Sequence, residues 1–166
     1  MNIFAIDHDP AIAAKHLVDS HCIKMVLESS QMLANCFSPE NLASENCPKT
    51  QKGTVRSHTH LHHPCSKWVK QSRENMRWLI KHAYAMDEER VARFESKPHF
   101  SISFIKWCDE HIDLSPVPEG KLTNFAQAMP EEFKDKCSIV AYRKFYKYGK
   151  VHLHQWKRNK PMWIFD

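Results

Sequence analysis

Apolar positions dominate one long segment near the start of the chain, from Asp9 to Cys36. Asp9 followed by Pro10 is typical of a helix N-cap and first turn. The apolar side chains that follow spread over much of the circumference of a helix: Ile12, Ala13, Leu17, Val18, Ile23, Met25, Val26, Leu27, Met32 and Leu33. A helix that is apolar on most sides is buried in the core. The pattern therefore predicts a buried helix over residues 9–36.

One polar stripe interrupts this apolar surface. His21, Lys24, Glu28 and Gln31 recur at helical spacing, which places them on one face. Charged and titratable side chains on a buried helix need partners, or a site that uses them. Two interpretations are open: an internal Lys24–Glu28 pair with His21 hydrogen-bonded nearby, or one wall of a functional cleft. We favour the cleft.

In the rest of the chain, segments with a helical pattern alternate with segments typical of extended chain or loops. Residues 2–6 read as a short strand or an extended arm that packs into the core, and residues 37–63 read as a long loop. Residues 122–129 read as a short helix or an apolar plug. Further helices are predicted over about 64–94, 100–111 and 138–148, the last ended by Gly149. The pattern predicts an all-α, mainly helical single domain over residues 1–166.

Composition narrows the classes of function. The chain has only three glycines and neither GxGxxG nor GxxxxGK[ST], so a Rossmann or P-loop nucleotide site has no support. A formal charge of +5 and twelve histidines suggest an anionic partner. Six scattered cysteines without a CxxC pair, and no signal-peptide pattern, predict reduced thiols and a cytoplasmic location. No apolar run approaches the ~20 residues of a membrane span, so no membrane partner is predicted, and the oligomeric state is left open.

A histidine run precedes the second long helical pattern. His58, His60, His62, His63 and Cys65 offer nitrogen and sulfur ligands, but their spacing matches no zinc motif, so we predict no metal and no cofactor. Since Pro64 begins a helix, His60 and His63 lie at its positive end, where an anion is favoured. We therefore predict phosphate contact here, with structural capping as the alternative. Asn75, further along the same helical pattern, is included in the predicted phosphate-binding set.

The C-terminal segment combines cations with aromatic rings. Cations follow a phosphate backbone while flat rings stack on bases, so the mixture is typical of a nucleic-acid surface. The alternative is a solvated basic surface whose rings fill the core. The predicted partner is nucleic acid, with duplex DNA favoured, and the residues predicted to bind it are Arg143, Lys147, Lys150, Trp156, Lys157, Arg158 and Lys160.

Several segments together resemble a family of short phage and bacterial proteins, mostly uncharacterised. They are MNIFAIDHDP, AAKHLVDSHCIKMVLESSQML, THLHHPCSKWV, LTNFAQAMP and AYRKFYKYGK, and they cover nearly the whole chain. More remotely, the plan is similar to the pyrimidine dimer DNA glycosylases of the endonuclease V type. Those are small, basic, all-helical proteins with an N-terminal arm in the active site and a glutamate on the first long helix.

The remote resemblance implies that an amine attacks the sugar C1′ to form a Schiff base, assisted by the glutamate. Glu28 would then handle protons, and Lys24 or His21 would contact phosphate. The glycosylase pattern exposes a small second residue after removal of Met1, whereas Asn2 is large enough to retain it. The candidate amines are therefore the α-amine at Met1 or Asn2, and Lys24 if burial lowers its pKa.

These observations predict a phage-type DNA-processing enzyme, a glycosylase with abasic-site lyase action on a damaged or modified base. Two alternatives stay open. One is a nucleotide or nucleic-acid hydrolase based on histidine and glutamate, or on a metal. The other is a non-catalytic module that binds nucleic acid or a host protein.

Overall fold

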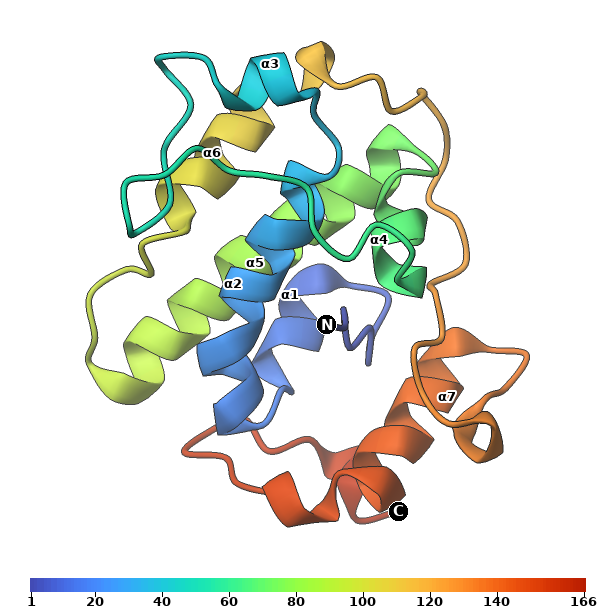
Figure 1. The fold of residues 1–166 in the computed structure, drawn as a ribbon. Helices are drawn as coiled ribbons and strands as arrows, with labels where there is room; N and C mark the ends of the chain where they lie inside the picture. Colours follow the sequence, from blue (N-terminus) through green and yellow to red (C-terminus); the bar gives the residue numbers. More distant parts are fainter.

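The computed structural model describes residues 1–166 and is all-α, as the hydrophobic pattern predicts (Figure 1). One hydrophobic core draws residues from all of its α-helices. None of the helices is long and apolar enough to cross a bilayer. The α-helices are α1 (Pro10–Lys15), α2 (Asp19–Ala34), α3 (Pro39–Leu42), α4 (Pro64–Val69), α5 (Arg73–Phe94), α6 (Ile102–Glu110) and α7 (Ser138–Lys144).

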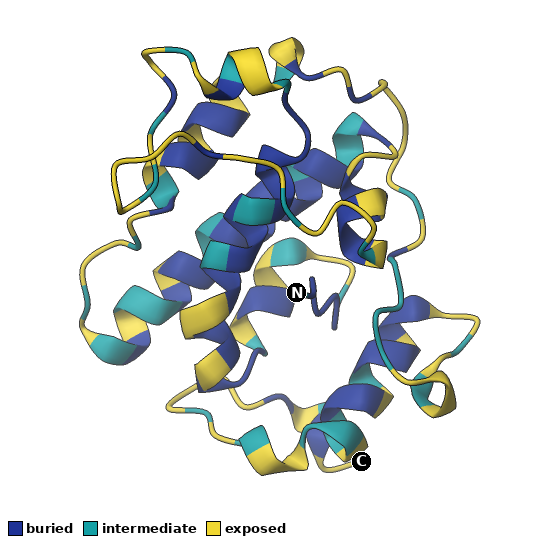
Figure 2. Cartoon of the chain, viewed as in Figure 1, coloured by how far each residue is buried: buried dark blue, intermediate teal, exposed yellow.

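The two longest helices, α2 and α5, cross at the centre of the molecule, and α1 packs against α5. Their inward faces are buried along most of their length (Figure 2). α7 and the C-terminal segment close the lower side in this view, while α6, α3 and the loop before α4 cover the upper side. The predicted loop 37–63 is irregular apart from the single helical turn of α3.

The predicted helix over residues 9–36 is wrong in one respect, because it is two helices. Asp9 caps α1 as predicted, with its side chain accepting from the backbone N–H groups of Ala11 and Ile12 at 2.8 and 3.0 Å. The chain then leaves the helical conformation at Val18 and restarts as α2. The break exposes carbonyl groups at the end of α1 that a continuous helix would use internally.

Those carbonyl groups find partners far away in the sequence. The Arg93 guanidinium donates to the carbonyls of Lys15 and Leu17, each at 2.7 Å. The Trp156 indole N–H donates to the carbonyl of His16 at 2.9 Å. Because these donors come from α5 and the C-terminal segment, the local sequence of residues 9–36 could not reveal the break.

The predicted helix over residues 64–94 is divided in the same way, into α4 and α5. Ser72 caps α5, its hydroxyl accepting from the Asn75 backbone N–H at 3.2 Å. The Asn75 side chain donates to the carbonyl of Trp68 and to the hydroxyl of Thr123, both at 2.8 Å. Asn75 is completely buried, so its predicted role in phosphate binding is wrong: its amide joins α4, α5 and the chain beyond residue 120.

The segment over residues 122–129 is extended, so the short-helix interpretation is wrong and the apolar plug is right. Phe125 is buried against Trp68 and Trp78, with ring centroids 5.4 and 4.7 Å apart. The predicted helix over 138–148 is α7 continued by a π-helical turn, Phe145–Gly149. A Cβ at Gly149 would lie 2.6 Å from the Phe145 ring, so glycine at this end allows the close approach.

Candidate functional site

A pocket of about 430 Å³ lies between α2 and the C-terminal half of the chain. The N-terminal arm lines it; residues 2–6 are buried and form no strand, and the chain turns at Phe4, whose φ is 42°. The wall formed by α2 carries three of the four residues of the predicted polar stripe. The pocket is lined by Met1, Asn2, Phe4, Ser20, His21, Lys24, Met25, Glu28, Ala128, Met129, Pro130, Phe145, Lys150 and Leu153.

Glu28 is the centre of the polar contacts in this pocket. Its Oε2 lies 3.4 Å from the α-amine of Met1 and accepts from the backbone N–H of Asn2 at 3.1 Å. Its Oε1 lies 3.2 Å from the Lys24 ammonium. Both interpretations of the stripe therefore hold in part, because Lys24 and Glu28 are paired and the pair also lines a pocket.

The N-terminal arm is anchored on both sides, which fixes the α-amine beside Glu28. The Met1 sulfur accepts a hydrogen bond from the Ser66 hydroxyl of α4 at 3.3 Å. The Asn2 side chain donates to the carbonyl of Ala128 at 2.8 Å and accepts from the backbone N–H groups of Ile3 and Phe4. Asn2 was predicted to be catalytic through an α-amine, and its side chain serves to hold the arm. Only its backbone N–H reaches Glu28.

His21 lies deeper in the same wall, stacked on the Phe4 ring with centroids 4.1 Å apart. Its Nδ1 is hydrogen-bonded to the hydroxyl of Tyr146. Burial, together with the positive charges of Lys150, Lys24 and His152, lowers the pKa of His21 to about 3. The ring is therefore neutral near pH 7 and cannot bind a phosphate as a cation.

Two lysines flank the pocket. The side chain of Lys24 is 70% exposed, so it lacks the burial on which its alternative role as nucleophile depended. The Lys150 ammonium lies 4.9 Å from the centre of the Phe145 ring, which is part of the opposite wall. Both lysines contribute positive charge to the lining of the pocket.

His60 and His63 do not line this pocket but a separate shallow hollow along residues 58–63. His63 caps α4, with its Nδ1 accepting from the Cys65 backbone N–H at 3.1 Å, so the capping alternative holds for it. His58 Nε2 is hydrogen-bonded to the carbonyl of Phe37 at 2.8 Å. No three His, Cys, Asp or Glu side chains form a group that could hold a metal ion.

The two hollows are nevertheless neighbours. Met1 contacts Ser66 on α4, the helix that His63 caps. Burial, with a smaller contribution from the positive charge of the N-terminal amine, lowers the pKa of His63. The predicted convergence is therefore confirmed for His21, Lys24 and Glu28, and only adjacency holds for His63.

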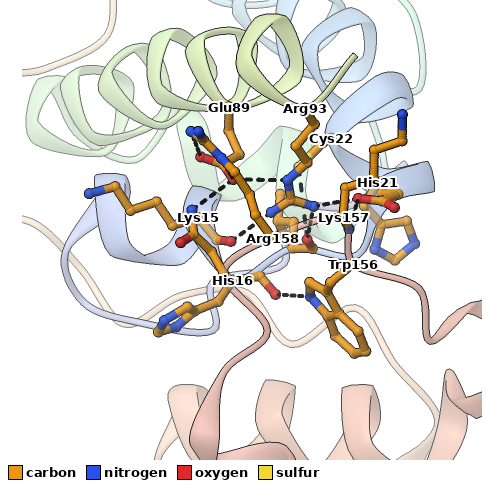
Figure 3. A network of polar contacts seen from close by, with 12 residues as sticks. Lys15, His16, His21, Cys22, Glu89, Arg93, Trp156, Lys157 and Arg158 are labelled. Atoms are coloured by element: carbon orange, nitrogen blue, oxygen red, sulfur yellow. Dashed lines mark hydrogen bonds and ion pairs between the residues drawn. The ribbon is translucent and has the colours of Figure 1, made fainter.

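Several predicted nucleic-acid contacts in the C-terminal segment are occupied within the protein. Arg158 forms two hydrogen bonds with the Glu89 carboxylate at 3.0 and 2.9 Å, and Trp156 binds the end of α1 (Figure 3). Arg143 donates to the carbonyl of Ile6 and to Asp7. The remaining predicted cations lie over aromatic rings while keeping their ammonium groups available: Lys147 over Tyr148, Lys157 over Phe94, and Lys160 over Trp156 and Phe165.

Sequence reasoning missed the wall opposite α2. Ala128, Met129 and Pro130 come from the extended segment, and Phe145 comes from the π-helical turn. No local pattern marks them, because they meet α2 only through packing between distant segments. No protein-family model matches the chain, and neither a curated protein nor a solved structure matches it.

Proposed function

We propose that the protein is a DNA N-glycosylase with abasic-site lyase action, and that the α-amine beside Glu28 is its nucleophile. One observation carries the proposal: the α-amine lies 3.4 Å from a buried carboxylate on the floor of a pocket flanked by lysines. Covalent catalysis by an amine needs a nucleophile with an adjacent group that can take its proton. Glu28 is that group.

The choice of amine follows from the surroundings of the two candidates. An α-amino group is intrinsically less basic than a lysine side chain, so more of it is uncharged near neutral pH. The α-amine is held in the pocket, whereas Lys24 extends into solvent. If Met1 is removed, the nitrogen of Asn2, 3.1 Å from the same oxygen, becomes the α-amine. Either form of the chain therefore places an α-amine against Glu28.

The reaction follows from this arrangement. A nucleotide extruded from the duplex brings its C1′ to the uncharged amine, whose proton has passed to Glu28. The amine nitrogen bonds to C1′ while the bond from C1′ to the base breaks, and the departing base takes up a proton. Opening of the sugar ring gives a Schiff base, and loss of a C2′ proton then expels the 3′ phosphate. Lys24 and Lys150 hold the flanking phosphates.

Borohydride trapping on a duplex with one abasic site tests the proposal. Borohydride reduces a Schiff base to a stable amine, so we expect a covalent complex whose DNA adduct maps to the N-terminal peptide. Two matched forms of the chain sharpen the test. Acetylation of the α-amine should abolish trapping, whereas Lys24→Arg, which keeps the charge but removes the other amine, should retain it.

Two results would contradict the proposal. Trapping that survives acetylation and disappears in Lys24→Arg would make Lys24 the nucleophile. If the protein binds the duplex with ordinary affinity but borohydride never traps a covalent complex, the protein is a non-catalytic binding module.

A further inference from the structure

The two ring nitrogens of His21 lie in different surroundings. Nδ1 faces the interior, where it is hydrogen-bonded to the hydroxyl of Tyr146. Nε2 has no partner within the protein and is not sealed from solvent, on a residue that lines the pocket. The ring plane is held by the nearly parallel Phe4 ring, at an angle of 14°. The imidazole therefore presents a single nitrogen to a ligand, and its chemistry depends on which nitrogen carries the proton.

Tyr146 decides the position of that proton. Its side chain is completely buried, and burial raises the pKa of the phenol well above its ordinary value, so the hydroxyl keeps its hydrogen. The only hydrogen-bond partner of that hydroxyl is Nδ1 of His21. Because a buried hydroxyl hydrogen needs an acceptor, the phenol donates to Nδ1 of His21. An unprotonated Nδ1 leaves the proton of a neutral imidazole on Nε2.

The charges around His21 favour the neutral ring. The groups that face it are Lys24 on its own helix, Lys150 and His152 from the C-terminal segment, and the neutral phenol of Tyr146. The nearest carboxylate in the pocket, Glu28, has both oxygens engaged, by the α-amine and by Lys24. No counter-ion is thus available to stabilise an imidazolium at this position.

We propose that Tyr146 is a positioning residue that holds His21 as its Nε2–H tautomer, so that the pocket offers a hydrogen-bond donor to an oxygen of the bound nucleotide. The ammonium groups of Lys24 and Lys150, which also line the pocket, can likewise only donate hydrogen bonds. The side chains on the walls therefore favour a ligand that presents oxygen acceptors there, from a phosphodiester or from a base carbonyl. The identity of the ligand as a nucleotide rests on the proposed function, whereas the tautomer does not.

The tautomer can be measured without any ligand. In two-bond ¹H–¹⁵N correlation spectra, a protonated and an unprotonated ring nitrogen resonate far apart. We expect His21 to show a protonated Nε2 and an unprotonated Nδ1, unchanged between pH 8 and 5. Tyr146→Phe removes the donor to Nδ1, so both tautomers should then appear, while a melting curve checks that the fold is kept. A protonated Nδ1 in the unaltered protein, or an imidazolium at pH 6, would overturn the proposal.

A second measurement identifies the acceptor. His21→Phe keeps the stack on Phe4 but loses the donor, and it should weaken binding of a lesion-bearing duplex about tenfold, the equivalent of one hydrogen bond in a partly buried site. If a phosphate is the acceptor, the tenfold difference disappears on a duplex with methylphosphonates around the site. If a base carbonyl is the acceptor, it disappears on a duplex with a tetrahydrofuran abasic analogue. A loss that persists on both duplexes contradicts the role in ligand selection.

The failure of this inference and the failure of the proposed function are distinguishable. If borohydride traps no complex but His21 carries its proton on Nε2, the proposed lyase reaction is wrong and the proposed hydrogen-bond donor stands. If borohydride traps a complex but His21 carries its proton on Nδ1, the proposed lyase reaction stands and the positioning role of Tyr146 is wrong.

Discussion

Two glutamates on the central helices are both buried but have different partners. Glu89 on α5 accepts from Arg93, Arg158 and Asn159, so both of its oxygens are bound by fixed donors. Glu28 on α2 is bound by an α-amine, a backbone N–H and the exposed Lys24, and it lines the pocket. Figure 3 shows Glu89 bound by Arg158 of the C-terminal segment, whereas Glu28 faces a pocket.

The difference separates a structural carboxylate from a reactive one. Burial alone would raise the pKa of Glu89, but the hydrogen bonds from Arg158, Arg93 and Asn159 outweigh it and lower that pKa to about 2. A carboxylate held so firmly in its charged form is a poor proton acceptor. Its partners instead join α5 to α1, α2 and the C-terminal segment. Glu28 joins only the N-terminal arm, and its partners include an amine that can react.

Removing the charge of Glu89 should give the largest loss of stability. Glu89→Gln leaves the Arg93 guanidinium, whose side chain is fully buried, without half of its counter-charge. Breaking a buried ion pair costs about 3–5 kcal/mol, so the free energy of unfolding in urea should fall by that amount. Glu88→Gln, an exposed neighbour on the same helix, is the matched control and should stay within about 0.5 kcal/mol of the unaltered protein. Equal effects of the two changes would show that the Glu89 network is not structural.

Lowering the pH should reduce the stability contributions of His21 and Glu89 in two different pH ranges. His21, whose pKa is lowered to about 3 in the folded protein from 6.5, binds a proton more readily when unfolded, so stability falls as the pH drops below 6.5. By pH 5 the loss is about 2 kcal/mol, from 1.36 kcal/mol per unit of pH. Glu89, with a folded pKa of about 2, keeps its full contribution above 4.5 and loses it only as the pH falls from 4.5 towards 2.

Urea titrations at pH 7.5, 5.0 and 3.5 measure both windows. His21→Gln should lose less stability than the unaltered protein between pH 7.5 and 5.0. Glu89→Gln should lose less only between 5.0 and 3.5. If His21→Gln shows the full acid dependence of the unaltered protein, His21 does not remain neutral in the fold.

The salt dependence of DNA binding should give the smallest effect. Replacing Lys24 and Lys150 by alanine removes two cations at the pocket, and each lost phosphate contact lowers the log–log salt slope by about one unit. We expect a slope flatter by about two units. Lys67→Ala with Lys81→Ala removes the same charge from the exposed side of α4 and α5 and should leave the slope unchanged. An equal change in both pairs would mean that the pocket does not determine where DNA binds.

The features that the sequence could predict are those decided by local spacing. Asp9 with Pro10 marks the start of α1, and the spacing of His21, Lys24 and Glu28 marks one wall of the pocket. The breaks before α2 and α5 escaped prediction because distant segments stabilise them. Distant donors bind the end of α1, and Ser72 and Arg73 at the start of α5 donate to the distant carbonyls of Lys121 and Pro118. Arg93, for example, is 76 residues from the carbonyl of Leu17 that it binds.

The C-terminal cations show a second limit of sequence reasoning. Composition predicts a basic surface but cannot separate a cation that is free from one that is paired. Arg158 and Lys150 have equivalent places in the pattern, yet Arg158 binds Glu89 while Lys150 lines the pocket. The phosphate-binding prediction for Asn75 failed for a related reason, since its partner Thr123 lies 48 residues away.

The measurement that tests the account most directly is Glu28→Gln, assayed for both turnover and melting. The variant keeps the size of the side chain and can still hydrogen-bond the N-terminal arm, but it cannot take a proton from the α-amine. The account predicts near-native melting, with borohydride trapping and strand cleavage slower by about 100-fold or more, as expected for a lost general base. A melting temperature lower by many degrees, with activity reduced only in proportion, would contradict it. Glu28 would then be a structural ion-pair member like Glu89.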